Sequence, residues 1–207
     1  MMNQVNYQKQ LDQLLAVLQQ QTNIPTLLLH SCCAPCSSYV LEYLNPYFFI
    51  CVLYYNPNIS PKEEYEHRKA EQKRLIAQMP CEHPITLMDC DYAPEAFEAI
   101  AAGLEDLPEG GARCMSCYRL RLEAAARAAK AGNFDYFGTT LSISPLKSAR
   151  ALNQIGEELA QRYGVAHLPA DFKKREGYKR SIELSRKYGL YRQNYCGCIY
   201  SKPTPEQ

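Results

Sequence analysis

The sequence lacks the segments that mark exported and membrane proteins. Its first twenty residues are polar and amphipathic, without the continuous apolar stretch of a signal peptide. No run approaches the roughly 18 apolar residues of a membrane span. Low-complexity segments, internal repeats and long linkers are absent as well. We therefore expect no membrane partner and place the protein in the cytoplasm.

A strong overall charge is also missing. The 207 residues carry a formal net charge of +1, which excludes a general attraction to polyanions. The charge is unevenly distributed, because residues 147–202 contain twelve Lys/Arg and five Asp/Glu, a local charge of +7. The rest of the chain then carries −6. A basic third of the chain suits an anionic partner such as RNA, and a solvated basic surface is the alternative.

Cysteine is abundant in comparison. The ten cysteines make up about 5% of the chain, below the roughly 8–10% of a disulfide scaffold. In a reducing compartment, clustered cysteines more often indicate metal or redox chemistry. Seven of the ten are clustered, as Cys32, Cys33 and Cys36, as Cys114 and Cys117, and as Cys196 and Cys198.

Apolar strand patterns alternate with helical patterns along the chain. Strands are predicted at 26–31, 47–55, 85–90, 134–140 and 165–168. Helices are predicted at 3–20, 36–44, 61–79, 94–103, 113–131, 145–163 and 177–188. This βαβ spacing predicts an α/β fold with a parallel sheet and helices on both faces. We expect one domain over 1–207, with an N-terminal helix in 1–21 and an irregular, cysteine-containing tail at 190–207.

The first cysteines follow directly on the first predicted strand. In parallel sheets, ligands bind beyond the carboxyl ends of the strands, so Cys32 and Cys33 lie at the expected functional edge. The alternative, that these are small buried residues, does not account for three thiols within five positions.

The second and third clusters also have informative spacing. Cys114 and Cys117 are three residues apart and share one face of a helix start, where the helix N-terminus, Arg113 and Arg119 favour thiolates. A disulfide between the cysteines of the CGC sequence at 196–198 would close a small, strained and easily reduced ring. This is typical of a redox-active pair or an open metal site.

Four thiolates suit either zinc or an iron–sulfur cluster. Zinc held by the pairs Cys33/Cys36 and Cys114/Cys117 would leave Cys32 and the CGC sequence unexplained. We therefore favour an iron–sulfur cluster with a second thiol site.

Polar and aromatic residues near these positions are candidates for substrate contacts. Residues after the second strand suit a polar substrate or simply form an Asn-Pro turn, and the basic, aromatic segment 171–181 suits single-stranded RNA. Basic and aromatic residues also surround the CGC sequence. The predicted substrate or RNA contacts are Tyr54, Asn56, Arg113, Lys173, Lys174, Arg192 and Tyr195.

Six motifs occur in the order and spacing of one known family. They read HSCCAPCSSYV, YYNPNISPKEEYEHR, EGGARCMSCYRLRLE, DYFGTTLSISPLKS, DFKKREGYKRSIELS and LYRQNYCGCIYS. From about residue 26 to 201 the chain resembles the QueH type of epoxyqueuosine reductase. The resemblance covers nearly the whole chain, and its motifs are long and specific.

The resemblance implies an activity and a cofactor. The reaction is the two-electron reduction of epoxyqueuosine to queuosine in the tRNA anticodon loop, the last step of queuosine biosynthesis. It implies a Rossmann-like sheet of the adenine-nucleotide α-hydrolase (HUP) type, a [4Fe-4S] cluster, a second mononuclear iron, no cobalamin and a separate electron donor of unknown identity.

The resemblance also implies roles for individual cysteines. Cys32, Cys33, Cys114 and Cys117 correspond to the cluster ligands. Cys196 and Cys198 correspond to a catalytic redox pair, seen as a disulfide when oxidised, or to ligands of the second metal. Cys36 either binds the second metal or lines the pocket.

Two other functions compete with this interpretation. An iron–sulfur-dependent tRNA sulfur transferase would need a glycine-containing pyrophosphate loop after the first strand, where this chain reads SCCAPCS. A zinc-stapled RNA-binding module without enzymatic activity would differ from both enzymes in its metal content.

Overall fold

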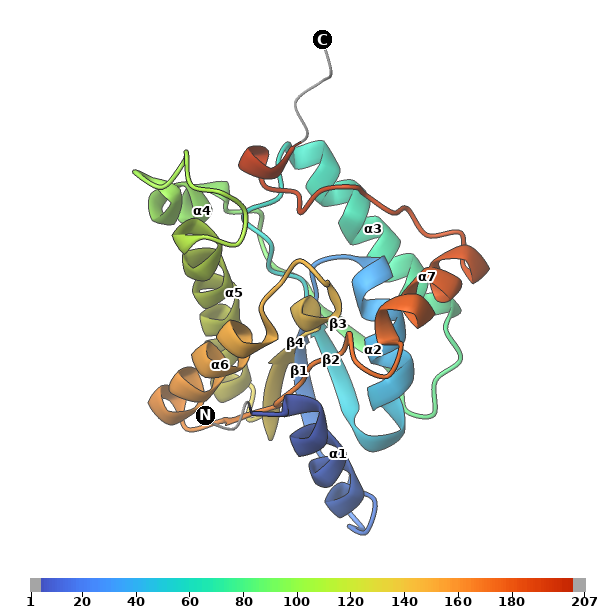
Figure 1. Ribbon diagram of the computed structural model, residues 1–207. Coiled ribbons are helices and arrows are strands. Elements are labelled where there is room, and N and C mark those ends of the chain that lie inside the picture. The colour runs from blue at the N-terminus through green and yellow to red at the C-terminus, as the bar shows by residue number, and fades with distance from the viewer. Residues whose placement is uncertain (1–4, 203–207) are drawn as a thin grey trace.

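The computed structural model describes residues 5–202, and its centre is a five-stranded, all-parallel sheet. The strand order is β3-β2-β1-β4-β5 (Figure 1). The strands span β1 (Thr26–His30), β2 (Phe49–Leu53), β3 (Thr86–Met88), β4 (Tyr136–Thr139) and β5 (Ala166–His167). The predicted α/β fold with a Rossmann-like parallel sheet is thus confirmed.

Helices cover both faces of this sheet. In Figure 1, α5 and α6 lie to the left of the strands, and α2, α3 and α7 lie to the right. The helices span α1 (Tyr7–Leu18), α2 (Ala34–Leu44), α3 (Lys62–Gln78), α4 (Pro94–Ala101), α5 (Ala112–Ala131), α6 (Ala149–Tyr163) and α7 (Gly177–Lys187). Short 3-10 turns occur at Asn45–Tyr47, Thr140–Ile143 and Ile199–Ser201. Within residues 5–202, no helix is both long enough and apolar enough to cross a bilayer.

The central strand β1 divides the core between the two layers. Successive side chains of a strand point to opposite faces. Leu27 and Leu29 therefore join the cluster formed with α1 and α2, whereas Leu28 joins the cluster formed with α5 and α6. All three leucines are fully buried.

The predicted strands and helices are all present, most of them with shorter ends, whereas α2 and α5 begin earlier than predicted. Residues 3 and 4 of the predicted first helix lie outside the described part of the chain, and α1 begins after Asn6, whose side chain accepts a hydrogen bond from the Lys9 amide. The predicted helix 145–163 starts later, at Ala149. Ser148 caps it by accepting a hydrogen bond from the Ala151 amide at 3.2 Å. Residues 144–148 instead form a turn that leads into the site described below.

The order of the strands places the site. From β1 the chain proceeds outward to β2 and β3, and then returns to the other side of β1 as β4. The loops after β1 and β4 therefore diverge over opposite faces of the sheet, which is where open α/β sheets bind ligands. Cys32 follows β1 and Lys147 follows β4, so this switch point contains both a thiol and an amine.

Candidate active site

Three thiols meet immediately after β1. The sulfur atoms of Cys32, Cys33 and Cys36 lie within 4.8 Å of one another. Cys33 is the N-cap residue of α2, and Pro35 occupies its first turn, so the helix begins before Cys36 rather than at it. This turn folds the chain back on itself and brings the three sulfur atoms together. In the described part of the chain, no other three potential metal ligands lie as close.

The three thiols differ in their pKa values. The pKa of Cys32 is well below its usual value, chiefly because Cys33 and Cys36 donate hydrogen bonds to its sulfur atom. Cys33 donates to Cys32, and this hydrogen bond raises the pKa of Cys33 to about 12. Its hydrogen bonds with Cys32 and Cys33 likewise raise the pKa of Cys36. These hydrogen bonds thus favour the thiolate at Cys32, whereas Cys33 and Cys36 must lose their protons before they can bind a metal.

The second pair of cysteines lies on the first turn of α5. The backbone amide of Gly110 donates to Cys114 Sγ at 3.2 Å, as expected for a sulfur atom at a helix start. Cys117 is buried, which raises its pKa to about 11, and Arg121 Nη1 lies 4.0 Å from its sulfur atom.

The arginines expected to act on this pair have other partners. Arg113 Nη1 donates to the backbone carbonyl oxygens of Leu104, Glu105 and Leu107 at 2.7–2.8 Å, and Arg119 pairs with Glu158. Arg121, for which we made no separate prediction, is the arginine that reaches a thiol of this helix.

The third pair approaches the second through the folded tail. Cys198 is buried in one small cluster with Cys117, Phe97 and Ala101. Arg68 Nη1 on α3 donates to the carbonyl oxygen of Cys196 at 3.2 Å. The intervening Gly197 has φ +106, a conformation that favours glycine. The CGC sequence is therefore held in place by packing on both sides.

Six of the seven clustered thiols, all except Cys33, line two adjoining cavities. The larger, of about 380 Å³, is lined by Cys32, Cys36 and Cys196 together with residues of the β4 loop, α7 and the tail. The smaller, of about 20 Å³, is lined by Cys114, Cys117, Cys196 and Cys198. Four residues line both cavities: Glu109, Lys147, Cys196 and Ser201.

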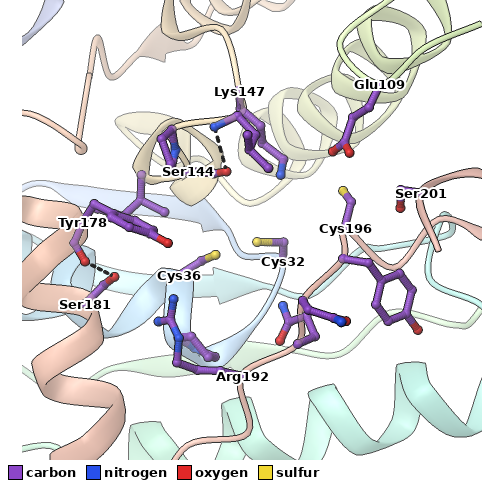
Figure 2. Close-up of a pocket in the computed structure, with 17 residues that line it drawn as sticks. Cys32, Cys36, Glu109, Ser144, Lys147, Tyr178, Ser181, Arg192, Cys196 and Ser201 are labelled. Atoms are coloured by element: carbon purple, nitrogen blue, oxygen red, sulfur yellow. Dashed lines mark hydrogen bonds between the residues drawn. The ribbon is translucent and has the colours of Figure 1, made fainter. Parts of the chain in front are cut away.

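Figure 2 shows the arrangement of the larger cavity. Cys32 and Cys36 approach it from the segment after β1 and Cys196 from the C-terminal tail, and the side chains of Lys147 and Glu109 extend toward the same space. Burial lowers the pKa of Lys147, but the thiols of Cys196, Cys32 and Cys36 outweigh this effect, and its pKa is raised. Lys147 is therefore a cation at neutral pH.

The residues present fit a thiolate-bound metal group. Thiolates are soft ligands that select zinc or iron–sulfur clusters, and three sulfur atoms already lie close together. Among the described residues, neither Cys114 nor Cys117 belongs to a group of three potential ligands within 4.8 Å of one another, although Cys114 packs against the same apolar cluster as Cys32 and Cys33. This arrangement suits a group wider than one ion.

The predicted substrate residues fall into two groups. Tyr54, Asn56 and Arg113 are buried, with at most 2% of each exposed, so their side chains face the interior of the protein. Lys174 and Arg192 are exposed, and Lys173 and Tyr195 are partly exposed. Of these four, Arg192 and Tyr195 line the larger cavity.

Comparison with known proteins identifies the family of this chain. The family model described as epoxyqueuosine reductase QueH matches residues 27–204. The chain belongs to the QueH family.

Individual relatives agree with the family model. The epoxyqueuosine reductase QueH of Staphylococcus epidermidis is 41% identical over 95% of this chain and 84% of its own length. The protein of the same name from Streptococcus pyogenes serotype M1 is 39% identical over 95% of this chain and 78% of its own length. The Thermotoga maritima protein of the same name is 32% identical over 85% of this chain and 90% of its own length. The family resemblance carried by the six motifs is thus confirmed.

Three QueH residues in this site were not predicted to be functional. Lys147 and Arg121 lie within the quoted motifs DYFGTTLSISPLKS and EGGARCMSCYRLRLE, and Glu109 is the first residue of the latter. Lys147 and Glu109 follow turns, where functional residues are common, and this signal was available in the sequence. Arg121 lies in mid-helix, where nothing local distinguishes it from a surface arginine.

Proposed function

We propose that this chain reduces epoxyqueuosine to queuosine in the anticodon loop of tRNA without cobalamin. The observation that carries the proposal is the convergence of three separate thiol segments on adjoining cavities at the switch point of the sheet. Its relatives are named for this reaction. The larger cavity, about 380 Å³, is within the size range of small-molecule sites.

The proposed cofactor is a [4Fe-4S] cluster bound by Cys32, Cys33, Cys114 and Cys117. When bound, such a cluster supplies electrons one at a time. A second, mononuclear iron is proposed beside it, with Cys36 as its candidate ligand, whereas Cys196 and Cys198 are assigned to the redox pair described next rather than to this iron. The cysteine triad supports metal binding in general, and the identity of each metal is part of the proposal.

Cys196 and Cys198 are proposed to supply the electron pair. Both carbon–oxygen bonds of the epoxide break, a carbon–carbon double bond forms, and the oxygen leaves as water with the two thiol protons. The two thiols are oxidised to a disulfide, so atoms and electrons balance. A separate electron donor then reduces this disulfide. Cys196 lines both cavities, as this role requires.

Lys147 is proposed to stabilise the oxygen as it leaves. The ammonium group extends into the cavity from the loop after β4 (Figure 2). A fixed cation next to a developing negative charge lowers the barrier, because it needs little reorganisation during the reaction. Exposed Tyr178 and Arg192 lie at the same cavity, where they suit stacking and phosphate contacts with a single-stranded loop.

The first experiment measures iron, zinc and acid-labile sulfide on protein purified without oxygen. It is followed by incubation with epoxyqueuosine-containing tRNA and a chemical reductant, and nucleosides are analysed by mass spectrometry. We expect iron and sulfide together with conversion to queuosine. Stoichiometric zinc without sulfide and without conversion, even after reconstitution, would overturn the proposal.

Single substitutions test the thiol roles. Cys196→Ser and Cys198→Ser should each abolish turnover while the protein retains its iron. Cys81→Ser is the matched control, because Cys81 is exposed and belongs to no cluster. Full activity of both CGC variants with the chemical reductant would exclude the dithiol step. Formation of a thiolated nucleoside that requires ATP would instead indicate a sulfur transferase.

A further inference from the structure

Arg121 is a fully buried cation without a carboxylate partner. The residue is 1% exposed, and no ion pair within 4.0 Å involves it in the part of the chain that the structure describes. Its Nη2 donates to Asn56 Oδ1 at 2.6 Å, and its Nε donates to His30 Nε2 at 3.2 Å. Removing a guanidinium from water is costly unless an opposite charge compensates it.

Both of these partners are neutral. His30 Nε2 lies 3.2 Å from Arg121 Nε and 3.1 Å from the carbonyl oxygen of Tyr55, and Nδ1 lies 2.9 Å from Thr139 Oγ1. Because a guanidinium only donates, the hydrogen bond from Arg121 uses the Nε2 lone pair of the tautomer that carries its proton on Nδ1. Asn56 is an amide, and its Nδ2 donates to the carbonyl oxygen of Ser31 at 2.8 Å. No acceptor on this side carries negative charge.

The groups that can balance Arg121 are the thiols. Cys117 Sγ lies 4.0 Å from Nη1, and the thiols of Cys32 and Cys196 are close enough to stabilise the guanidinium electrostatically. Lys147, which lines both cavities, adds a second positive charge. The site thus places two cations, of which Arg121 is fully buried, against thiols from three segments and one carboxylate, that of Glu109. One carboxylate does not offset two cations, so thiolates are needed to balance the charge.

We propose that Arg121 is a positioning residue that offsets the negative charge of a thiolate-bound iron–sulfur centre and thereby sets its reduction potential. The inference rests on the proposed function, which supplies that centre. An iron–sulfur cluster with four thiolate ligands is anionic, and reduction adds a further negative charge. A fixed cation beside it stabilises the reduced form more than the oxidised form, so it raises the potential.

The same side chain aligns the segments that supply the ligands. Arg121 lies one helical turn after Cys117 on α5, His30 ends β1 just before Cys32, and Asn56 follows β2. Its hydrogen bonds therefore join the α5 thiols to the strand that precedes the cysteine triad. A thiolate site built from distant segments requires such a connection, because its ligands share no local backbone geometry.

The test is a spectroscopic redox titration of the reconstituted protein under anaerobic conditions. Arg121→Met should shift the potential of the centre to a lower value, whereas Arg121→Lys, which keeps the charge, should shift it less. Arg119→Met is the matched control, because Arg119 is on the same helix but is exposed and pairs with Glu158. It should titrate like the unaltered protein.

A second variant covers the case in which Arg121→Met does not fold. Asn56→Asp leaves the guanidinium in place and adds a carboxylate beside Nη2, so it should also lower the potential. Unchanged potentials in whichever of these variants folds would overturn the role of Arg121 alone. A parent protein that assembles no iron–sulfide centre would overturn both this inference and the cofactor of the proposed function.

Discussion

Arg68 Nη1 donates a hydrogen bond to the carbonyl oxygen of Cys196, which lies 3.2 Å away and 128 positions further along the chain. The same side chain pairs with Glu64 at 2.7 Å, and its guanidinium stacks on the Tyr195 ring at 5.1 Å. Arg68 is 1% exposed. A buried residue of α3 therefore helps to hold Cys196 against the domain, together with the hydrogen bond from the Ser60 amide to the carbonyl oxygen of Gly197 at 3.0 Å.

Arg68→Met should release this segment. We expect the rate of epoxyqueuosine reduction to fall by up to about 100-fold, since small displacements of reacting groups have effects of that size. The free energy of unfolding should fall by about 2 kcal/mol, because charged hydrogen bonds are lost. Denaturant unfolding and single-turnover assays check both. Lys73→Met, an exposed α3 control that pairs with Asp89, should cost less than about 1 kcal/mol.

Gly197→Ala should disturb the CGC sequence without removing a thiol. At φ +106 a side chain is strained, and its Cβ would lie 3.0 Å from both Arg68 Nη1 and Ile59 Cγ1. The expected loss of stability is about 1–3 kcal/mol, with a large loss of turnover. Gly189→Ala is the control, because φ is also positive there but the space is open. Equal turnover in the two variants would contradict the importance of this packing.

Lys147→Met should slow the chemical step more than it weakens tRNA binding. If Lys147 stabilises the leaving oxygen, its removal should lower the single-turnover rate by about 10²–10³, the effect typical of such groups. Arg150→Met removes the same charge three residues later from an exposed position that does not line the cavity. The rate constant and the RNA affinity are measured for both. A change confined to affinity would indicate a phosphate contact instead.

Arg192→Ala should weaken binding of the anticodon stem-loop. Its guanidinium is at the cavity and 6.0 Å from the Tyr178 ring centroid, so it suits a phosphate or a stacked base. Anisotropy titrations at several salt concentrations should show a smaller salt dependence, by about one ion contact. Arg127→Ala, on an exposed part of α5 about 15 Å beyond Cys117, should leave the slope unchanged.

Acid should destabilise the fold through His167. Burial lowers its pKa to about 4 from the usual 6.5, so the unfolded chain binds more protons between these values. The free energy of unfolding should therefore rise with pH from about 4 to 6.5, by at most about 1.4 kcal/mol per pH unit from this residue, and then level off. His167→Gln should reduce this dependence in urea titrations, and the part due to His30, whose pKa burial lowers to about 3, should remain. The exposed control His67→Gln should retain it.

The His167 ring is confined because α6 packs closely against it at Gly156. A Cβ on Gly156 would lie only 2.2 Å from His167 Nε2, so the helix α6 approaches the ring at a position that only glycine permits. In addition, His167 Nδ1 has no hydrogen-bond partner among the described residues. Protonation would therefore place a charge where nothing solvates it.

Local patterns in the sequence determined the architecture and the candidate thiols. The alternation of strands and helices depends on residues that are neighbours along the chain. The parallel sheet with helices on both faces could therefore be predicted from periodicity. The position of Cys32 at the functional edge follows from the same reasoning, because it needs only the end of β1. The family motifs added the chemistry, since they carry residue types at fixed spacing.

Only the tertiary structure decided which of these residues meet. Strand order places the β4 loop next to the triad and gives Lys147 its place in the cavity. Packing turned Tyr54 and Asn56 inward and made Arg121, rather than Arg113 or Arg119, the cation that approaches Cys117. Arg68 and Cys196 show the physical reason: their contact depends on how distant elements pack, which no pattern along the chain reports.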